Sequence, residues 1–144
     1  MDPKHLERMK KMYGKAPINN LFNEHIINYA PDGQTSIDFT PGKEHCHTMM
    51  SLHGSGYFKL LDDAAFFAAQ AQDDTNFIFT TSFNTYLIRA VVPGTELVSK
   101  GWVTSGGKSL IIAESRLEEK ETGKLVASGS GTFQKSPHQL PAYE

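Results

Sequence analysis

The sequence has little cysteine, no excess of basic charge and no long apolar run. Cys46 is its one cysteine, so no disulfide can form within the chain. The formal net charge at pH 7 is −2, which gives no basic surplus for binding nucleic acid or an anionic membrane. The longest apolar stretches, such as residues 64–69, are far too short to span a bilayer. We therefore expect neither nucleic acid nor membrane as a partner.

Signals for export are also missing. Residues 1–5 include basic side chains, but no apolar core follows them as it would in a signal peptide. Together with the single cysteine, this predicts a cytoplasmic location. The 144 residues, of which 39% are hydrophobic and 10% aromatic, suffice for one compact domain with a substantial core but not for two.

Two segments show helical patterns. Residues 2–13 begin with Asp2 as a capping residue and Pro3 in the first turn, and Gly14 can end the helix. Residues 55–72 give the strongest signal, because apolar side chains recur there at helical spacing. These side chains are Tyr57, Leu60, Leu61, Ala64, Ala65, Ala68 and Ala71. A helix that is apolar on nearly all sides is expected to be buried.

Most of the remaining chain has the alternation and turn residues typical of strands. One strand is predicted before the long helix and four after it, at residues 34–40, 77–91, 96–104, 109–119 and 125–134. This order predicts an α+β arrangement in which one antiparallel sheet wraps one long central helix. A long strand at the edge of such a sheet needs covering, so we expect two copies to pair at that edge.

The start of the long helix resembles a known family. Residues 53–56 read His-Gly-Ser-Gly, and Asp62 stands nine positions after His53. This is similar to the hotdog-fold acyl-CoA thioesterases of the PaaI and 4-hydroxybenzoyl-CoA thioesterase group. Those proteins carry a His-Gly-Gly segment at the start of the central helix and an Asp or Glu nine positions after the His. The glycine-containing turns at residues 106–108 and 122–127 also look like the family's hairpins.

The resemblance implies the hotdog fold, with a sheet of five to six strands around the helix. Residues 1–30 would then form an N-terminal helix and extension, residues 31–135 the hotdog domain and residues 136–144 a C-terminal tail. It also implies hydrolysis of the thioester bond of an acyl-CoA or acyl-carrier substrate, without a cofactor, by a homodimer with shared active sites. Whether two dimers pair into a homotetramer stays open.

Thioester hydrolysis needs an activated water or a carboxylate to attack the carbonyl, and donors that stabilise the oxyanion. The free amides of a helix start can supply such donors, and we expect the N–H of Gly54, alone or together with Ser55, to do so. The resemblance implies that Asp62 acts as general base or nucleophile, facing the helix start of the other subunit. Thr80, eighteen residues later, holds the water or Asp62, or is an ordinary strand residue. His53 orients the thioester or only bonds to backbone.

Two positions depart from the family pattern. Ser55 replaces the second glycine of the motif, and His47 stands where some members have an asparagine that activates water or polarises the thioester. We keep His47 among the catalytic candidates and Ser55 among the substrate-binding ones. Both departures bear on the rate, the substrate and the assignment of roles.

Three further residues are candidates for contacts with the substrate. Arg89 and Lys108 lie near strand or turn ends, where their charges could meet the phosphates of CoA. Phe66 could line an acyl tunnel. The alternatives are solvated charges on a sheet face and an ordinary core aromatic.

A metal site and two other functions remain as alternatives. His45, Cys46 and His47 follow one another, and His53 stands six positions after His47. However, one cysteine and no defined ligand spacing make a metal site unexpected. The same fold could serve as a non-catalytic module that binds acyl-CoA or another acyl ligand, or as a hydratase or dehydratase. Fold alone does not decide between them.

Overall fold

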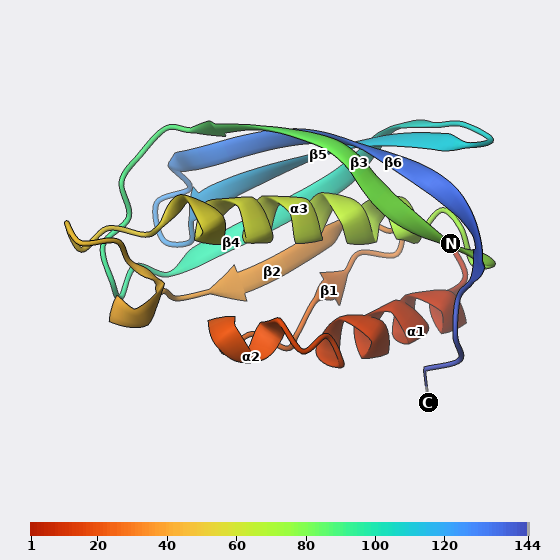
Figure 1. The fold of residues 1–144 in the computed structure, drawn as a ribbon, viewed down its shortest axis with the longest axis horizontal. Coiled ribbons are helices and arrows are strands. Elements are labelled where there is room, and N and C mark those ends of the chain that lie inside the picture. The colour runs from red at the N-terminus through yellow and green to blue at the C-terminus, as the bar shows by residue number, and fades with distance from the viewer. Residues whose placement is uncertain (144) are drawn as a thin grey trace.

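The structure, a computed structural model, describes residues 1–143. One long helix lies in a curled antiparallel sheet, and an N-terminal helical segment lies beside it (Figure 1). The elements are α1 (Pro3–Gly14), α2 (Asn19–Phe22), β1 (Asn28–Tyr29), β2 (Thr35–Phe39), η1 (Lys43–His45), α3 (Gly54–Gln70), β3 (Asn76–Leu87), β4 (Leu97–Gly106), β5 (Leu110–Glu119) and β6 (Leu125–Gln139). None of the helices in this range is long and apolar enough to cross a membrane.

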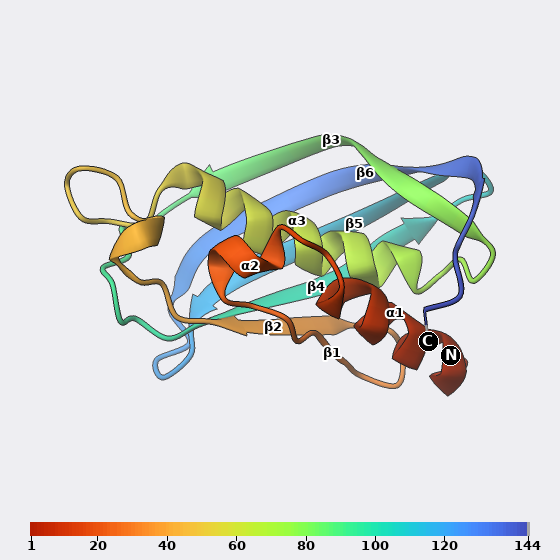
Figure 2. The ribbon, with the colours of Figure 1, turned by 60° about the horizontal axis from the view of Figure 1, so that its bottom comes forward.

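The sheet has six strands in the order β1-β2-β4-β5-β6-β3, and every neighbouring pair is antiparallel. It curls around α3, which runs along its concave face (Figures 1 and 2). The long strand β3 forms one edge. The predicted α+β hotdog arrangement is therefore confirmed.

Helix α3 packs very closely against the sheet because small side chains and strand hydroxyls meet its backbone. Ala64 is fully buried, and its carbonyl accepts a hydrogen bond from the hydroxyl of Thr35 at 2.7 Å. One turn earlier, the carbonyl of Leu60 accepts from the hydroxyl of Ser99, also at 2.7 Å. These bonds give buried polar groups a partner and fix the depth of the helix in the sheet.

The N-terminal segment covers the face of α3 that the sheet leaves open (Figure 2). Helix α1 buries Leu6, Met9 and Tyr13, and the ring of Tyr13 lies 5.2 Å from that of Phe67 on α3. Arg8 ties α1 to distant parts of the chain by donating to the carbonyls of Asp74, Leu140 and Pro141. The segment is therefore an integral layer of the fold.

Two strand boundaries differ from the sequence prediction by more than two residues. Strand β3 ends at Leu87, where the backbone N–H groups of Ile88 and Arg89 both donate to the carbonyl of Val126. Strand β6 continues to Gln139, because its last residues pair with the start of β3. Part of the predicted C-terminal tail is thus a strand. Both boundaries depend on a partner strand that is distant in the sequence.

The contact between β4 and α3 gives a test of this packing. A Cβ at Gly101 would collide with the carbonyl of Ala64, so we expect Gly101→Ala to lower the free energy of unfolding by about 2 kcal/mol. Equilibrium urea denaturation at one protein concentration measures this. The matched control is Gly106→Ala in the same strand, where the nearest atom to the added Cβ is 4.0 Å away. Equal stability of the two variants would contradict the close packing.

Candidate active site

The start of α3 presents one backbone amide without a partner. His53 caps the helix, because its Nδ1 accepts the N–H of Ser55 at 3.0 Å. The N–H of Gly54 has no acceptor within residues 1–143. A methyl group of Leu87 lies 3.8 Å from the position of a Cβ on Gly54. The amide that remains for a ligand at the positive end of the helix is therefore that of Gly54.

The capping bond changes how two predicted residues must be understood. Since Nδ1 of His53 accepts, the proton of the neutral ring is on Nε2. The N–H of Ser55 is used within the chain, and its hydroxyl lies 2.8 Å from the same Nδ1. The structure thus gives His53 a bond to backbone, one of the two roles considered for it. It leaves the Ser55 side chain exposed beside the helix start.

Asp62 lies on the side of α3 that faces β3. Its Oδ1 accepts a hydrogen bond from the hydroxyl of Thr80 at 3.0 Å. Burial raises the pKa of Asp62 to about 6, and the neighbouring carboxylate of Asp63 adds to the rise. The hydrogen bond from Thr80 and the charge of Lys59 oppose it. A carboxyl group with such a pKa can take up and release a proton near neutral pH.

Gly54 and Asp62 of one chain are too far apart to act on one carbonyl. They are eight residues apart on a continuous helix, which places them about 12 Å apart along its axis. A thioester carbonyl and an attacking water, linked by contacts of about 3 Å each, span less than that. A site that uses both groups on one carbonyl would therefore need a second copy of one of them.

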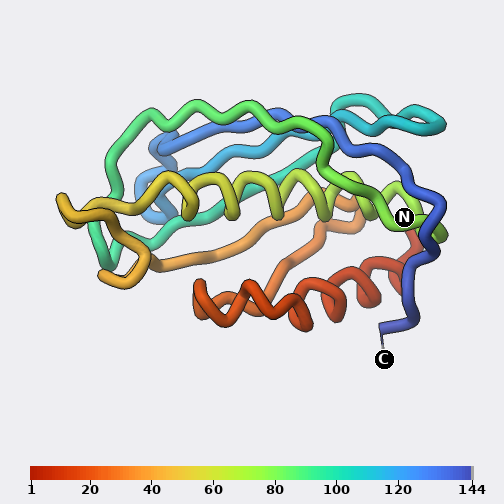
Figure 3. Tube along the Cα trace, viewed as in Figure 1, coloured from red at the N-terminus to blue at the C-terminus, as the bar shows by residue number. Residues whose placement is uncertain are grey.

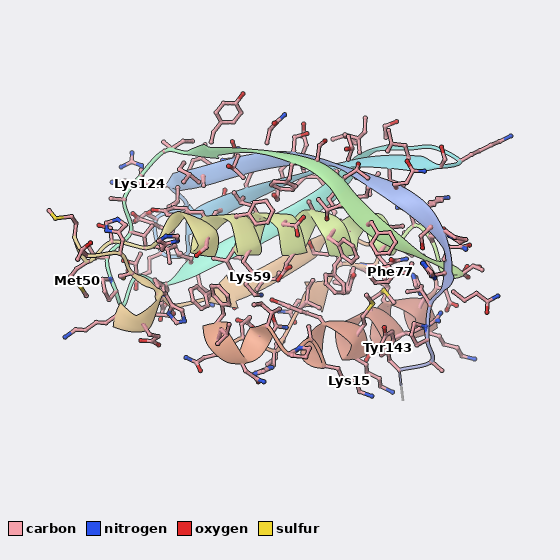
Figure 4. The ribbon with its side chains drawn as sticks, viewed as in Figure 1. Lys15, Met50, Lys59, Phe77, Lys124 and Tyr143 are labelled. Atoms are coloured by element: carbon pink, nitrogen blue, oxygen red, sulfur yellow. The ribbon has the colours of Figure 1, made fainter. Side chains whose placement is uncertain are left out.

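The turn before α3 contains His47 and the other residues considered for a metal. His47 is exposed, and its Nδ1 accepts the N–H of Met49 at 3.1 Å. Figure 4 shows Met50 at the tip of this turn, away from the helix. His45 is buried and uses both ring nitrogens, one with the N–H of Gly42 and one with the carbonyl of Leu21. Within residues 1–143 there is no group of three or more potential metal ligands.

The proposed substrate contacts are dispersed in a single chain. Arg89 is exposed in the loop after β3. This loop lies next to the start of α3, since the hydroxyl of Tyr57 donates to the backbone carbonyl of Arg89. Figure 3 shows this loop and the helix start at the same end of the molecule. Lys108 lies in the hairpin between β4 and β5, which approaches the C-terminal end of α3 near Gln72. One chain therefore does not bring the two cations together.

Phe66 belongs to an aromatic cluster under the C-terminal half of α3. Its ring lies 5.2 Å from Phe67, 5.8 Å from Phe77 and 5.9 Å from Phe133. It is only partly buried among residues 1–143. Packing in the core is its observed role.

Two features near the site were not found from the sequence. A hollow of about 780 Å³ opens beside the helix start, and Leu21 and Phe22 of α2 line it together with His53 and Ser55. On α3, Lys59 forms a buried ion pair with Asp63. The spacing of four residues between a lysine and an aspartate on an apolar helix was the available signal for the second feature.

Comparison with known proteins assigns the chain to a family. Residues 49–126, more than half of the chain, match the model of the thioesterase superfamily. No curated protein gives a significant match. Among solved structures, the Escherichia coli PaaI protein from the phenylacetic acid degradation operon has a TM-score of 0.85 and 18% identity, covering 96% of this chain and 97% of that chain.

Two further structures show the same fold at similar distance. Zebrafish thioesterase superfamily member 2 has a TM-score of 0.79 and 18% identity, with 94% of this chain and 98% of that chain covered. The phenylacetic acid degradation protein PaaI from Thermus thermophilus has a TM-score of 0.74 and 17% identity, with 84% and 100% covered. At these identities the structures bear on the fold, and the family match extends over the helix start and Asp62. The chain belongs to the hotdog-fold thioesterase superfamily.

Proposed function

We propose that the protein hydrolyses the thioester bond of an acyl-CoA or acyl-carrier substrate. Membership of the thioesterase superfamily supports thioester hydrolysis in general. The observation that carries the residue assignment is the environment of Asp62. This carboxyl group sits on a buried helix, accepts a hydrogen bond from Thr80 and has its pKa raised by burial to about 6. Such a group is suited to act as a base near neutral pH.

In the proposed reaction, ionised Asp62 takes a proton from a water molecule that attacks the thioester carbonyl. The hydroxyl of Thr80 holds one carboxylate oxygen and leaves the other for the water. The N–H of Gly54 donates to the oxyanion that forms, at the positive end of α3. The proton then passes from Asp62 to the departing thiolate. The same placement serves a nucleophilic Asp62, which would form a mixed anhydride that water hydrolyses.

We further propose that the site is shared between two copies of the chain. Strand β3 is the last strand of the sheet, so its outer edge has no partner strand within residues 1–143. Exposed apolar side chains lie along this strand and in the loop after it, among them Phe79, Tyr86, Leu87 and Ile88. Pairing of two β3 edges would cover them. It would also bring Asp62 of the partner subunit toward Gly54, which resolves the separation of about 12 Å along one helix.

The same pairing supports roles for the dispersed substrate contacts. Antiparallel pairing of two edges places opposite ends of the two sheets next to each other. Arg89 at the helix start and the partner's Lys108 are then our proposed contacts for the CoA phosphates. Phe66, whose ring is partly uncovered, is the proposed contact for the acyl group. Pairing of two dimers into a tetramer would leave these sites unchanged.

The first test is removal of the proposed base. We expect Asp62→Asn to lower kcat by at least about 100-fold, the usual contribution of a general base. Thiol release from a panel of short, medium and aryl acyl-CoA thioesters measures this. The control is Asp38→Asn, an exposed carboxylate that pairs with Lys120 on the outside of the sheet. Full activity of a folded, dimeric Asp62→Asn variant would refute the assignment of Asp62 as the base. If wild-type protein binds an acyl-CoA tightly and releases no thiol, the protein is a binding module instead.

The pH dependence gives a second test. Since Asp62 must be ionised to accept a proton, kcat/KM should fall on the acid side with a midpoint near pH 6. The hydrogen bond from Thr80 lowers the pKa of Asp62, so Thr80→Val should move this midpoint to higher pH. Profiles of both proteins with one substrate measure the shift. An identical acid limb in the variant would show that Thr80 does not act on the base.

Mixing two inactive variants tests the shared site. Gly54→Pro removes only the proposed donor, because proline is accepted at the first position of a helix and the extended backbone of His53 suits a residue before proline. A dimer of one Gly54→Pro subunit and one Asp62→Asn subunit keeps one intact site. An equal mixture, allowed to exchange, should regain about a quarter of the wild-type rate. No recovery after proven exchange would mean that the two groups act within one chain.

A further inference from the structure

A buried lysine lies beneath the middle of α3, on the side that faces the N-terminal segment (Figure 4). Only 8% of the Lys59 side chain is exposed, and its Nζ lies 2.6 Å from Oδ2 of Asp63. The same ammonium donates to Oδ1 of Asn19 at 2.7 Å. It also stands 5.3 Å from the ring centre of Tyr13 and 5.0 Å from that of Phe22. Helices α1 and α2 thus enclose the cation on the side away from the sheet.

Stability alone does not account for this ion pair. Burying two charges carries a desolvation penalty, and apolar side chains of similar volume often stabilise a protein as well or better. The surroundings would suit apolar side chains, since Tyr13 and Phe22 already face the site. The pair is instead next to Asp62 in the sequence, because Asp63 is the following residue of α3.

We propose that Lys59 and Asp63 are positioning residues that set the charge felt by Asp62 from the far side of the helix. This inference rests on the proposed function, in which Asp62 is the base. Consecutive residues on a helix point about 100° apart, so Asp62 turns to β3 while Asp63 turns to the N-terminal segment. Their carboxylates meet different partners, Thr80 and Lys59. The two groups are coupled through space, without a direct bond.

The directions of this coupling follow from the charges. The negative charge of Asp63 raises the pKa of Asp62, whereas the positive charge of Lys59 lowers it. Burial raises the pKa of Asp63 itself, and Lys59 opposes that rise. Lys59 therefore favours the ionised form of Asp63 and offsets part of the effect of Asp63 on Asp62. Glu24, whose pKa burial also raises, is the other acid on which Lys59 acts.

The sheet strands packed against α3 present hydroxyl groups to it, whereas α1 presents two titratable side chains. These are His5, whose Nε2 lies 3.0 Å from the carbonyl oxygen of Gln70, and Tyr13, whose pKa is raised by burial and by Asp63. Strand β2 offers Thr35, β3 offers Thr80, β4 offers Ser99 and β5 offers Ser115. The pair on α3 thus supplies the charges closest to the base. Its ammonium is enclosed by α1 and α2, which precede the residues that match the family model. The N-terminal segment therefore takes part in the site by holding Lys59 in place.

The test is the pH profile of Asp63→Asn. This change removes the neighbouring anion and leaves the cation, and both effects lower the pKa of Asp62. We expect the acid midpoint of kcat/KM to move down by about one pH unit, with little change in the plateau because Asp62, Thr80 and Gly54 remain. The control Asp38→Asn removes the same charge from a pair on the outside of the sheet and should move nothing.

The double variant Lys59→Met/Asp63→Asn leaves neither charge of the pair without its partner. It can therefore replace Asp63→Asn in the pH-profile test if the single variant does not fold. Because the effect of Asp63 on Asp62 exceeds that of Lys59, its midpoint should lie below that of wild type. It should also lie above that of Asp63→Asn. A midpoint in the double variant equal to that of wild type would overturn the proposal.

A direct titration separates this inference from the proposed function. The carboxyl carbon of Asp62 can be followed by NMR in protein labelled with ¹³C-aspartate and assigned by its loss in Asp62→Asn. A downward shift in Asp63→Asn, or in the double variant if the single one does not fold, supports the coupling even where no thioester is hydrolysed. Hydrolysis with titration curves that coincide for wild type and these variants would overturn the coupling and leave the thioesterase proposal intact.

Discussion

The close seating of α3 in the curled sheet is the contact on which the rest of the molecule depends. The helix can approach because Ala64 meets Gly101 without intervening side chains. Hydroxyl groups of Thr35 and Ser99 then bond to helix carbonyls. Both proposed catalytic groups are carried on this one helix, so its depth and rotation in the sheet determine where Gly54 and Asp62 point. A rigid element of this kind is a suitable carrier for groups that must be held precisely.

The helix presents a different chemistry on each side. Toward the sheet it is apolar and fully buried. Toward β3 it places Asp62 against Thr80, where burial moves the carboxyl pKa toward neutrality. Toward the N-terminal segment it places the ion pair of Lys59 and Asp63. Two adjacent acids thus have separate environments and, in our proposal, separate tasks, because the helical rotation between consecutive residues turns them to different partners.

The geometry of a single helix also limits what one chain can do. The amide at Gly54 and the carboxyl at Asp62 lie about 12 Å apart along the axis. Within the part of the chain that the structure describes, the long strand β3 ends the sheet and has no partner at its outer edge. Both features favour the proposed pairing with a second copy of the chain at that edge. In the proposed dimer the second copy is part of the chemistry, since it joins two half-sites that α3 keeps apart.

The sequence by itself determined the elements whose signals are local. The apolar repeat fixed α3, alternation and turn residues placed the strands, and the spacing of His53 and Asp62 indicated the family and the candidate carboxylate. Tertiary structure alone decided the partners: the bond from Thr80 to Asp62, the extension of β6 to Gln139, and the enclosure of Lys59 by α1 and α2. It also separated Lys108 from Arg89. The spacing of apolar residues shows which face of a helix or strand is buried. A hydrogen bond or ion pair between distant residues depends instead on how the whole chain packs.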